Sequence, residues 1–446
     1  MMSDQPRMAL SRRASRAKPQ PISEMLAYAL SNPQVISLAA GFVDYETLPA
    51  LRVGRIVGEL LGEARQARVT LQYGTTQGLP ELRGAVHRYL ASLDDAAPEA
   101  YPGSAEDVVI TNGSQQLLHL VTDVLVDLDD IVIAAWPDYF VYTSALPGMG
   151  AQVRAVEMDE EGLIPDRLDA LLAALEKVGQ LSRVKIIYAC TYHQNPTGAT
   201  LSEDRRAQLV DIVRRWSRRA GHRIILIEDA AYRELTYAPA SAARPRSLKS
   251  YDTDNAYVAL MHTFSKPFAP GLKIGYGLLP RDLVEPVLVN KGGRDFGTSN
   301  LSQRVMLAAM EQGDFAQHID TLRQAYAAKR DAMLEALDEG LGALGEQVRF
   351  SRPAGGLYVW LTLPEAIDTG RDGPLFERAI AHGVLYVPGA YCYPPDPRLP
   401  VPTNTIRLSF GTPSVADIRQ GIARLSAAIR EVLEAGADLA GAQTRR

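Results

Sequence analysis

The sequence predicts an α/β protein whose main sheet is mostly parallel and covered by helices. Two observations lead to this prediction: apolar, β-branched runs recur between turn residues, and amphipathic segments separate these runs. The runs that we interpret as strands are residues 107–112, 130–136, 184–192, 223–231, 257–265 and 273–280. The segments between them that carry apolar residues at helical spacing are residues 117–127, 168–179 and 201–221.

A smaller α+β domain is expected after this sheet. Residues 301–340 have helical spacing throughout, and the runs at 356–364 and 405–411 alternate in the way that strands do. We therefore expect three parts: an N-terminal arm with part of the small domain at 1–50, a large domain at 51–310, and the C-terminal small domain at 311–446.

Composition excludes several classes of function. The 446 residues are 46% hydrophobic and 22% charged, and the net charge of −5 argues against a broad nucleic-acid surface. We find no run of about 20 apolar residues and no apolar core of a signal peptide, so we expect a cytoplasmic protein with no membrane partner. Two cysteines and seven scattered histidines give no disulfide framework and no metal site.

Polar groups of distinct chemistry follow three of the expected strands. Lys266 comes after 257–265, Asp229 ends an apolar run, and Asn195 precedes Pro196, which favours an extended backbone that aims the amide out of the strand end. Ligands of an open α/β sheet bind at the carboxyl ends of its strands. Read singly, Lys266 is an ordinary surface lysine and Asn195 an ordinary turn residue, but a buried Asp229 requires a cation or a proton.

A fourth segment predicts an anion site. The run 107–112 breaks at Gly113, and a helix is expected to begin near Ser114 with free backbone N–H groups and a positive dipole end. A simple helix cap is the structural alternative. Tyr232 follows Asp229 by three residues and adds a hydroxyl donor. An amine, a phosphate-binding helix terminus, a carboxylate that needs a cation, and donors at Asn195 and Tyr232 together fit pyridoxal 5′-phosphate (PLP).

Ten segments resemble the fold-type-I PLP-dependent aminotransferases, in the branch of the 2-aminoadipate and kynurenine aminotransferases. In chain order they are ISLAAGFVDYETLP, LQYGTTQGLPELR, TNGSQQ, WPDYF, QNPTG, EDAAYRE, TFSKPFAPGLKIGYG, PAGGLYVW, VPG and IRLSFG. The resemblance implies a large PLP-binding domain with a mainly parallel seven-stranded sheet flanked by helices. It also implies a homodimer with shared active sites.

The resemblance also assigns roles to residues. Lys266 would form the Schiff base with PLP, Asp229 would pair with the pyridine nitrogen, and Tyr232 would contact the ring's 3-oxygen together with Asn195. The further cofactor contacts that it implies are Ser114, Gln115, Gln116, Tyr139, Thr263, Ser265, Lys273 and, from a second subunit, Tyr73. Arg407 would bind the substrate carboxylate through a two-point fork, and Asn195, Gly41, Phe42 and Tyr358 would complete the substrate site.

Two positions depart from the family pattern. Lys273 stands where close relatives usually have Arg, so that a point charge replaces a rigid fork. Val43 and Asp44 stand where many relatives have a proline-containing AGGLP pattern, in a loop that borders the substrate side chain. The substrate is therefore open, although Tyr28, Phe42, Tyr45 and Tyr358 are candidates for an aromatic wall.

The leading hypothesis is transfer of an amino group from an L-amino acid to a 2-oxo acid such as 2-oxoglutarate. The same cofactor also supports β- or γ-elimination or replacement, decarboxylation or oxidation of a specialised amino acid, and the sequence leaves this alternative open. A PLP-binding transcription regulator is not expected, because the segment before ISLAAG is too short for a winged-helix domain. The GLGALG run at 340–345 is not a dinucleotide fingerprint, since a helix-like run precedes it in place of a strand.

Overall fold

The computed structural model describes residues 8–16, 21–237 and 244–443. Its main feature is a sheet of eight strands in the order β2-β9-β8-β7-β6-β3-β4-β5. The strands are β2 (Val108–Thr111), β3 (Ile131–Trp136), β4 (Gln152–Asp159), β5 (Gly162–Leu163), β6 (Val184–Cys190), β7 (Ile225–Asp229), β8 (Val258–Thr263) and β9 (Gly275–Leu278). Strands β4, β3, β6, β7 and β8 are mutually parallel, which confirms the predicted mainly parallel sheet.

The sheet has one strand more than the resemblance implies. Strand β5 is only two residues long and pairs antiparallel with β4 at one edge. At the other end of the sheet, β9 runs antiparallel to both β8 and β2.

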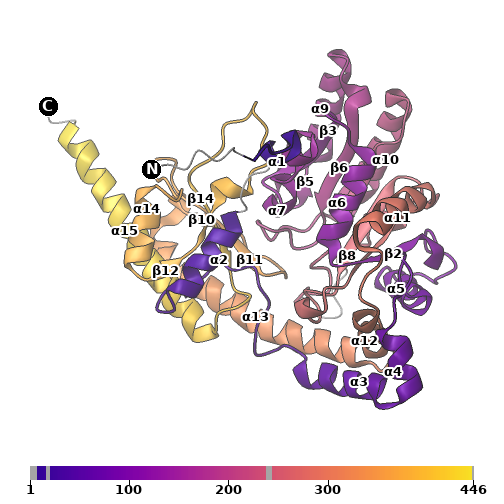
Figure 1. The fold of residues 1–446 in the computed structure, drawn as a ribbon. Coiled ribbons are helices and arrows are strands. Elements are labelled where there is room, and N and C mark those ends of the chain that lie inside the picture. The colour runs from indigo at the N-terminus through magenta and orange to yellow at the C-terminus, as the bar shows by residue number, and fades with distance from the viewer. Residues whose placement is uncertain (1–7, 17–20, 238–243, 444–446) are drawn as a thin grey trace.

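Helices cover both faces of this sheet (Figure 1). On one face, α6 (Ser114–Leu125) and α11 (Arg281–Asp295) pack their apolar residues against alternate positions of the strands. On the other face, α9 (Pro165–Lys177) and α10 (Glu203–Ala220) pack against the intervening positions. The strands are therefore buried on both sides, as their nearly continuous apolar sequences require.

Further helices pack around the β2–β9 end of the sheet. They are α3 (Ala50–Gly62), α4 (Ala64–Leu71), α5 (Pro80–Leu93) and α12 (Asn300–Glu311). The other helices in the first part of the chain are α1 (Arg12–Arg16), α2 (Pro21–Ser31), α7 (Phe140–Thr143) and α8 (Leu146–Met149). Within the described ranges, no helix is long and apolar enough to cross a membrane.

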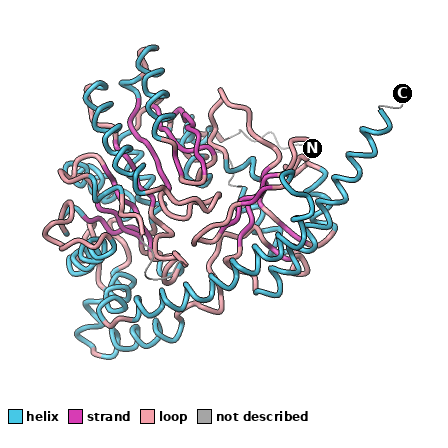
Figure 2. The backbone as a smooth tube through the Cα atoms, turned by 180° about the vertical axis from the view of Figure 1, so that it is seen from behind, coloured by secondary structure: helices cyan, strands magenta, loops and turns pink. Residues whose placement is uncertain are grey.

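A second, antiparallel sheet has the strand order β10-β11-β14-β13. Its strands are β10 (Arg349–Phe350), β11 (Tyr358–Thr362), β13 (Val387–Pro388) and β14 (Thr405–Ser409). The helices beside it are α13 (Asp314–Leu341), α14 (Pro374–Ala381) and α15 (Val415–Gln443). Helix α13 extends from this sheet to the helices below the large sheet, as both views show (Figures 1 and 2).

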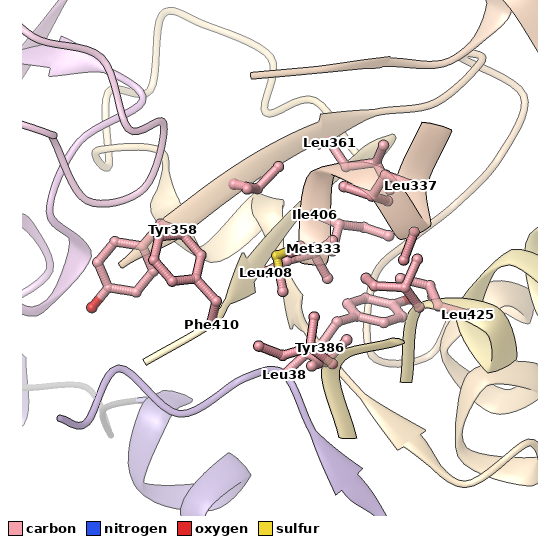
Figure 3. Packing of buried hydrophobic residues seen from close by; sticks show 14 of the residues in the cluster. Leu38, Met333, Leu337, Tyr358, Leu361, Tyr386, Ile406, Leu408, Phe410 and Leu425 are labelled. Atoms are coloured by element: carbon pink, nitrogen blue, oxygen red, sulfur yellow. The ribbon is translucent and has the colours of Figure 1, made fainter. Parts of the chain in front are cut away.

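The N-terminal segment after α2 joins the smaller sheet. Strand β1 (Ile36–Ser37) pairs parallel with β12 (Val384–Leu385), and Leu38 packs in the core between β11, β14 and the helices. Figure 3 shows this core, with the Tyr358 hydroxyl pointing out of the apolar cluster. The Tyr358 hydroxyl therefore forms a polar edge of the small-sheet core, and it lies 3.1 Å from the hydroxyl of Tyr232, which follows β7 of the large sheet.

Candidate active site

The predicted polar residues meet where neighbouring strands of the large sheet end. Strands β6, β7 and β8 are adjacent and parallel, and Asn195, Asp229 and Lys266 lie at or just beyond their carboxyl ends. Arg407 comes from β14 of the smaller sheet, on the opposite side. The site is thus built between the two sheets.

Lys266 lies in the turn after β8 and is half-buried. Its Nζ donates a hydrogen bond to the Gly41 carbonyl oxygen at 2.8 Å and lies 5.9 Å from the centre of the Tyr232 ring. Burial, and next the charge of Arg407, lower the pKa of this amine from 10.5 to about 8. Near neutral pH the amine therefore loses its proton far more readily than a surface lysine does.

Asp229 is the last residue of β7 and is only 4% exposed. Its carboxylate accepts hydrogen bonds from the Tyr188 hydroxyl at 2.9 Å and from the Ala231 N–H at 3.2 Å. Burial raises the pKa of Asp229, and these bonds and the charge of His262 oppose the rise only in part. Such a carboxylate gains most from a cationic partner, and a protonated pyridine nitrogen has that character.

Arg407 is 1% exposed and is partly satisfied by the protein itself. Its Nη1 donates to the Asn195 side-chain oxygen at 2.9 Å, and its Nη2 donates to the Ala39 carbonyl at 2.7 Å. Its Nε is buried without a hydrogen-bond partner among the described residues. A buried guanidinium with a free donor suits a carboxylate ligand.

Two tyrosines close the space beside Lys266. The hydroxyls of Tyr232 and Tyr358 lie 3.1 Å apart, and the Arg407 guanidinium lies 4.6 Å from the centre of the Tyr358 ring. A Cβ atom on Gly41 would come within 2.5 Å of the Tyr358 hydroxyl, so a larger residue at this position would have to displace the Tyr358 side chain. The geometry brings Lys266, Arg407, Tyr232, Tyr358 and Gly41 together.

The predicted anion site lies at the start of α6. Gly113 precedes the helix with a φ of 79°, a conformation that glycine adopts without strain. Strand β9 approaches this turn so closely that a Cβ on Gly275 would lie 2.3 Å from the Gly113 carbonyl carbon and 2.4 Å from the Ser114 nitrogen. The first N–H groups of α6, at Ser114 and Gln115, are thereby held at the positive end of the helix dipole.

Thr263 pairs with Gly275, the residue that approaches this turn, and Lys273 precedes Gly275 by two residues. Thr263 donates from Oγ1 to the Ser265 Oγ at 2.9 Å, in the turn that leads to Lys266. Lys273 is exposed, and its φ of 55° is in the left-handed region. Backbone N–H groups, hydroxyls and a nearby cation are the donor set that a phosphate group needs.

Gln116 has a different environment from the other expected phosphate contacts. Its Nε2 donates to Asp295 at 2.6 Å, and its Oε1 accepts from the Asn112 backbone N–H at 2.8 Å. Asp295 is paired in turn with the fully buried Lys291 at 2.8 Å. Gln116 therefore links the first turn of α6 to α11 through Asp295. Sequence reasoning missed this link, although the i,i+4 spacing of Lys291 and Asp295 indicated an ion pair on the helix that contains them.

Tyr139 is half-buried at the start of α7, and its backbone is held by Asp138. The Asp138 carboxylate accepts from the Tyr139 N–H at 2.8 Å and from the Ala135 N–H at 2.9 Å. Burial raises the pKa of Asp138 to about 8. Gln194, next to Asn195, donates to the Pro137 carbonyl at 3.1 Å. Asp138 and Gln194 thus tie the Tyr139 loop to the Asn195 loop, and sequence reasoning singled out neither.

The remaining candidates lie at the surface of the chain. Tyr73 is 83% exposed and packs edge-on against the exposed Phe296, with ring centres 5.5 Å apart. Phe42 and Tyr45 are 50% and 77% exposed, whereas Tyr28 is half-buried. Tyr358 is the fully buried member of the four residues considered for an aromatic wall.

The chain is similar to proteins of known function over most of its length. The family model for aminotransferase class I and II matches residues 33–425. The chain is 34% identical to aromatic-amino-acid aminotransferase 1 of Thermococcus litoralis over 425 residues, which cover 95% of this chain and 94% of the relative.

Solved structures extend the similarity to three dimensions. The kynurenine aminotransferase of Pyrococcus horikoshii, in complex with PMP, KYN and KYA, matches with a TM-score of 0.84 and 32% identity, covering 95% of this chain and 97% of that one. The alpha-aminoadipate aminotransferase of Thermus thermophilus, complexed with N-(5′-phosphopyridoxyl)-L-leucine, matches with a TM-score of 0.79 and 29% identity, covering 95% and 98%.

Proposed function

This chain belongs to the class I and II aminotransferases, PLP-dependent enzymes that transfer amino groups, and from this membership we propose which of its residues carry out the transfer. PLP, when bound, supplies an electron sink for the substrate α-carbon. Lys266 would hold the cofactor through Nζ and afterwards carry a proton at that atom. Asp229 would keep the cofactor's ring nitrogen cationic, and the first turn of α6 with Thr263 and Ser265 would bind the phosphate.

Arg407 orients the amino acid in this proposal. Its free Nε and the fork beside it would bind the α-carboxylate, and Asn195 fixes the guanidinium from the other side. Orientation of the carboxylate determines which bond at the α-carbon faces Lys266. Tyr232, Tyr358 and Gly41 narrow the space around the amine and exclude water from it.

The observation that carries the proposal is the contact chain around the reactive amine. The pKa of Lys266 is lowered, and its Nζ contacts the Gly41 carbonyl and lies 5.9 Å from the centre of the Tyr232 ring. The charge of Arg407 contributes to the lowered pKa, and the Nε of Arg407 is buried without a hydrogen-bond partner among the described residues. An amine that is ready to lose its proton beside a carboxylate-binding arginine suits proton transfer at an α-amino acid. The comparisons do not favour the alternative of elimination or replacement chemistry.

The test uses purified holoenzyme and a panel of L-amino acids. We expect the visible absorbance of the cofactor to change with an amino donor and to return when 2-oxoglutarate is added. The Lys266→Ala variant should lose this cycle, whereas Lys177→Ala, a change of an exposed lysine at the end of α9, should retain it. Release of a side-chain fragment without return of the absorbance, or full turnover by Lys266→Ala, would refute the proposal.

The amino donor in this proposal has an aromatic or other large apolar side chain. Phe42 and Tyr45 expose their rings just after Gly41, which contacts Lys266. A relative named for aromatic amino acids supports the same class. Alanine at Phe42 and Tyr45 should shift the preference among amino acids, and an unchanged preference would contradict this assignment.

The active unit in this proposal is a homodimer in which Tyr73 reaches the cofactor phosphate of the other subunit. The support is the exposure of Tyr73 and Phe296, two adjoining aromatic rings that the single chain leaves in water. Dilution to monomers should therefore lower specific activity, and monomers of full activity would contradict the shared site. Location in the cytoplasm stays a prediction, with which the free thiols of Cys190 and Cys392 agree.

A further inference from the structure

The segment of residues 39–44 contacts the two cations of the site in succession. The Ala39 carbonyl accepts from Arg407 at 2.7 Å, and the Gly41 carbonyl accepts from Lys266 at 2.8 Å. Gly41 also lies against the Tyr358 hydroxyl without room for a Cβ atom. A shift of this segment along its length would therefore change the hydrogen bonds of both Arg407 and Lys266.

The segment is fixed at its far end by a buried ion pair. Asp44 is 6% exposed, and its carboxylate lies 2.9 Å from the Nζ of Lys329. The Asp44 backbone N–H donates to the Tyr326 hydroxyl at 2.8 Å. Tyr326 and Lys329 are three residues apart on α13 and so share one face of that helix.

Lys329 also reaches the end of the strand that carries Arg407. Its Nζ donates to the Gly411 carbonyl at 3.3 Å, beyond the end of β14. A Cβ on Gly411 would come within 2.3 Å of the Phe42 carbonyl oxygen, so the two backbones are in direct contact. One ammonium group thus joins α13, the 39–44 segment and the end of β14.

We propose that Asp44 and Lys329 are positioning residues of the substrate site, which set the register of residues 39–44 against Arg407 and Lys266. This inference depends on the proposed function of that site. The Asp44 carboxylate faces Lys329 within the protein. The pair acts on substrate binding through Ala39 and Gly41, without touching the substrate itself.

The test compares Lys329→Met and Asp44→Asn with the double variant that carries both changes. Each single change leaves one buried charge without its partner and should lower the melting temperature, while the double variant leaves none and should recover much of that loss. If the pair positions the segment, KM for the amino donor should rise roughly tenfold or more in all three variants, because small displacements of binding groups are costly. The affinity for PLP should change by less than about threefold, since the α6 turn is untouched.

Two further measurements make the result decisive. The matched control is Arg419→Met on α15. It removes the cation of an exposed ion pair with Glu335, which lies on α13 as Lys329 does, and it should leave KM unchanged. Binding of 2-oxoglutarate to the PLP form, followed by difference absorbance, reports the same weakening without turnover. An unchanged KM and unchanged binding in the single variants would overturn the proposal, and so would a double variant that recovers KM together with its melting temperature.

Failure of the proposed function would give a different result. In that case wild-type holoenzyme would show no amino transfer with any donor, whereas failure of the positioning role leaves the wild type active and the variants equal to it.

Discussion

Gly275→Ala is the change for which the structure predicts a specific loss of cofactor affinity. The added Cβ would lie 2.3 Å from the Gly113 carbonyl carbon, 2.4 Å from the Ser114 nitrogen and 2.7 Å from the Gly113 Cα. All three are backbone atoms of the turn that begins α6, so no side-chain rotation relieves the clash. Strand β9 and this turn must therefore separate.

The magnitude follows from the cost of overpacking, which is about 1–3 kcal/mol for an extra methyl group in a tightly packed place. If that cost falls on the phosphate-binding turn, the dissociation constant for PLP rises about 5- to 150-fold, since about 1.4 kcal/mol corresponds to a factor of ten. Titration of cofactor-free protein with PLP, followed by absorbance, measures the constant. Pyridoxal without its phosphate should lose much less affinity, because it does not use the turn.

Gly271→Ala is the matched control for this prediction. Gly271 lies only a few residues before Gly275, and a Cβ there would meet no atom within 4 Å. Its affinity for PLP should equal that of the wild type. A folded Gly275→Ala protein that binds PLP with wild-type affinity would show that the close approach of β9 does not hold the turn.

Two further predictions concern the cations of the site. Arg407→Lys keeps the positive charge but loses the two-point guanidinium fork. The loss of one hydrogen bond to a charged group costs about 1.5–3 kcal/mol, so kcat/KM should fall about 10- to 150-fold in steady-state kinetics. An unchanged kcat/KM would contradict carboxylate binding by this residue. Lys266 has a pKa near 8 because burial and Arg407 disfavour its protonated form, so the labelling of its amine in cofactor-free protein should rise with pH through about 8. Arg407→Met removes a like charge and should move that midpoint upward, whereas a wild-type midpoint near the ordinary 10.5 would refute the burial of the amine.

Much of the fold could be predicted because the central strands are buried on both faces. Strands β3, β6, β7 and β8 have continuous apolar sequences, and each lies where such a run predicted it. Strand β4 was missed because its positions alternate between buried and exposed and include charged residues, as expected near a sheet edge. Pairing partners and the antiparallel direction of β9 depend on contacts between distant residues, which a single sequence does not display.

The site was predictable to the extent that its residues lie in short local patterns. Lys266 and Asp229 follow apolar runs directly, so a strand end and a polar group could be read together. Asp138 and Lys329 were not found, because their roles come from partners brought together by the fold. The helical position of Lys329 indicates which face it shares with Tyr326, but not that Asp44 lies against that face.

The hydrogen bond between Arg407 and Ala39 joins residues 368 positions apart. The ribosome therefore has to add β14 before Arg407 can meet Ala39, whereas Asp229 and Lys266 are added much earlier. Until then the nascent polypeptide contains Lys266 and Asp229 without Arg407. The proposed active site can therefore be complete only after the C-terminal strand β14 has been made and has packed against the earlier part of the chain.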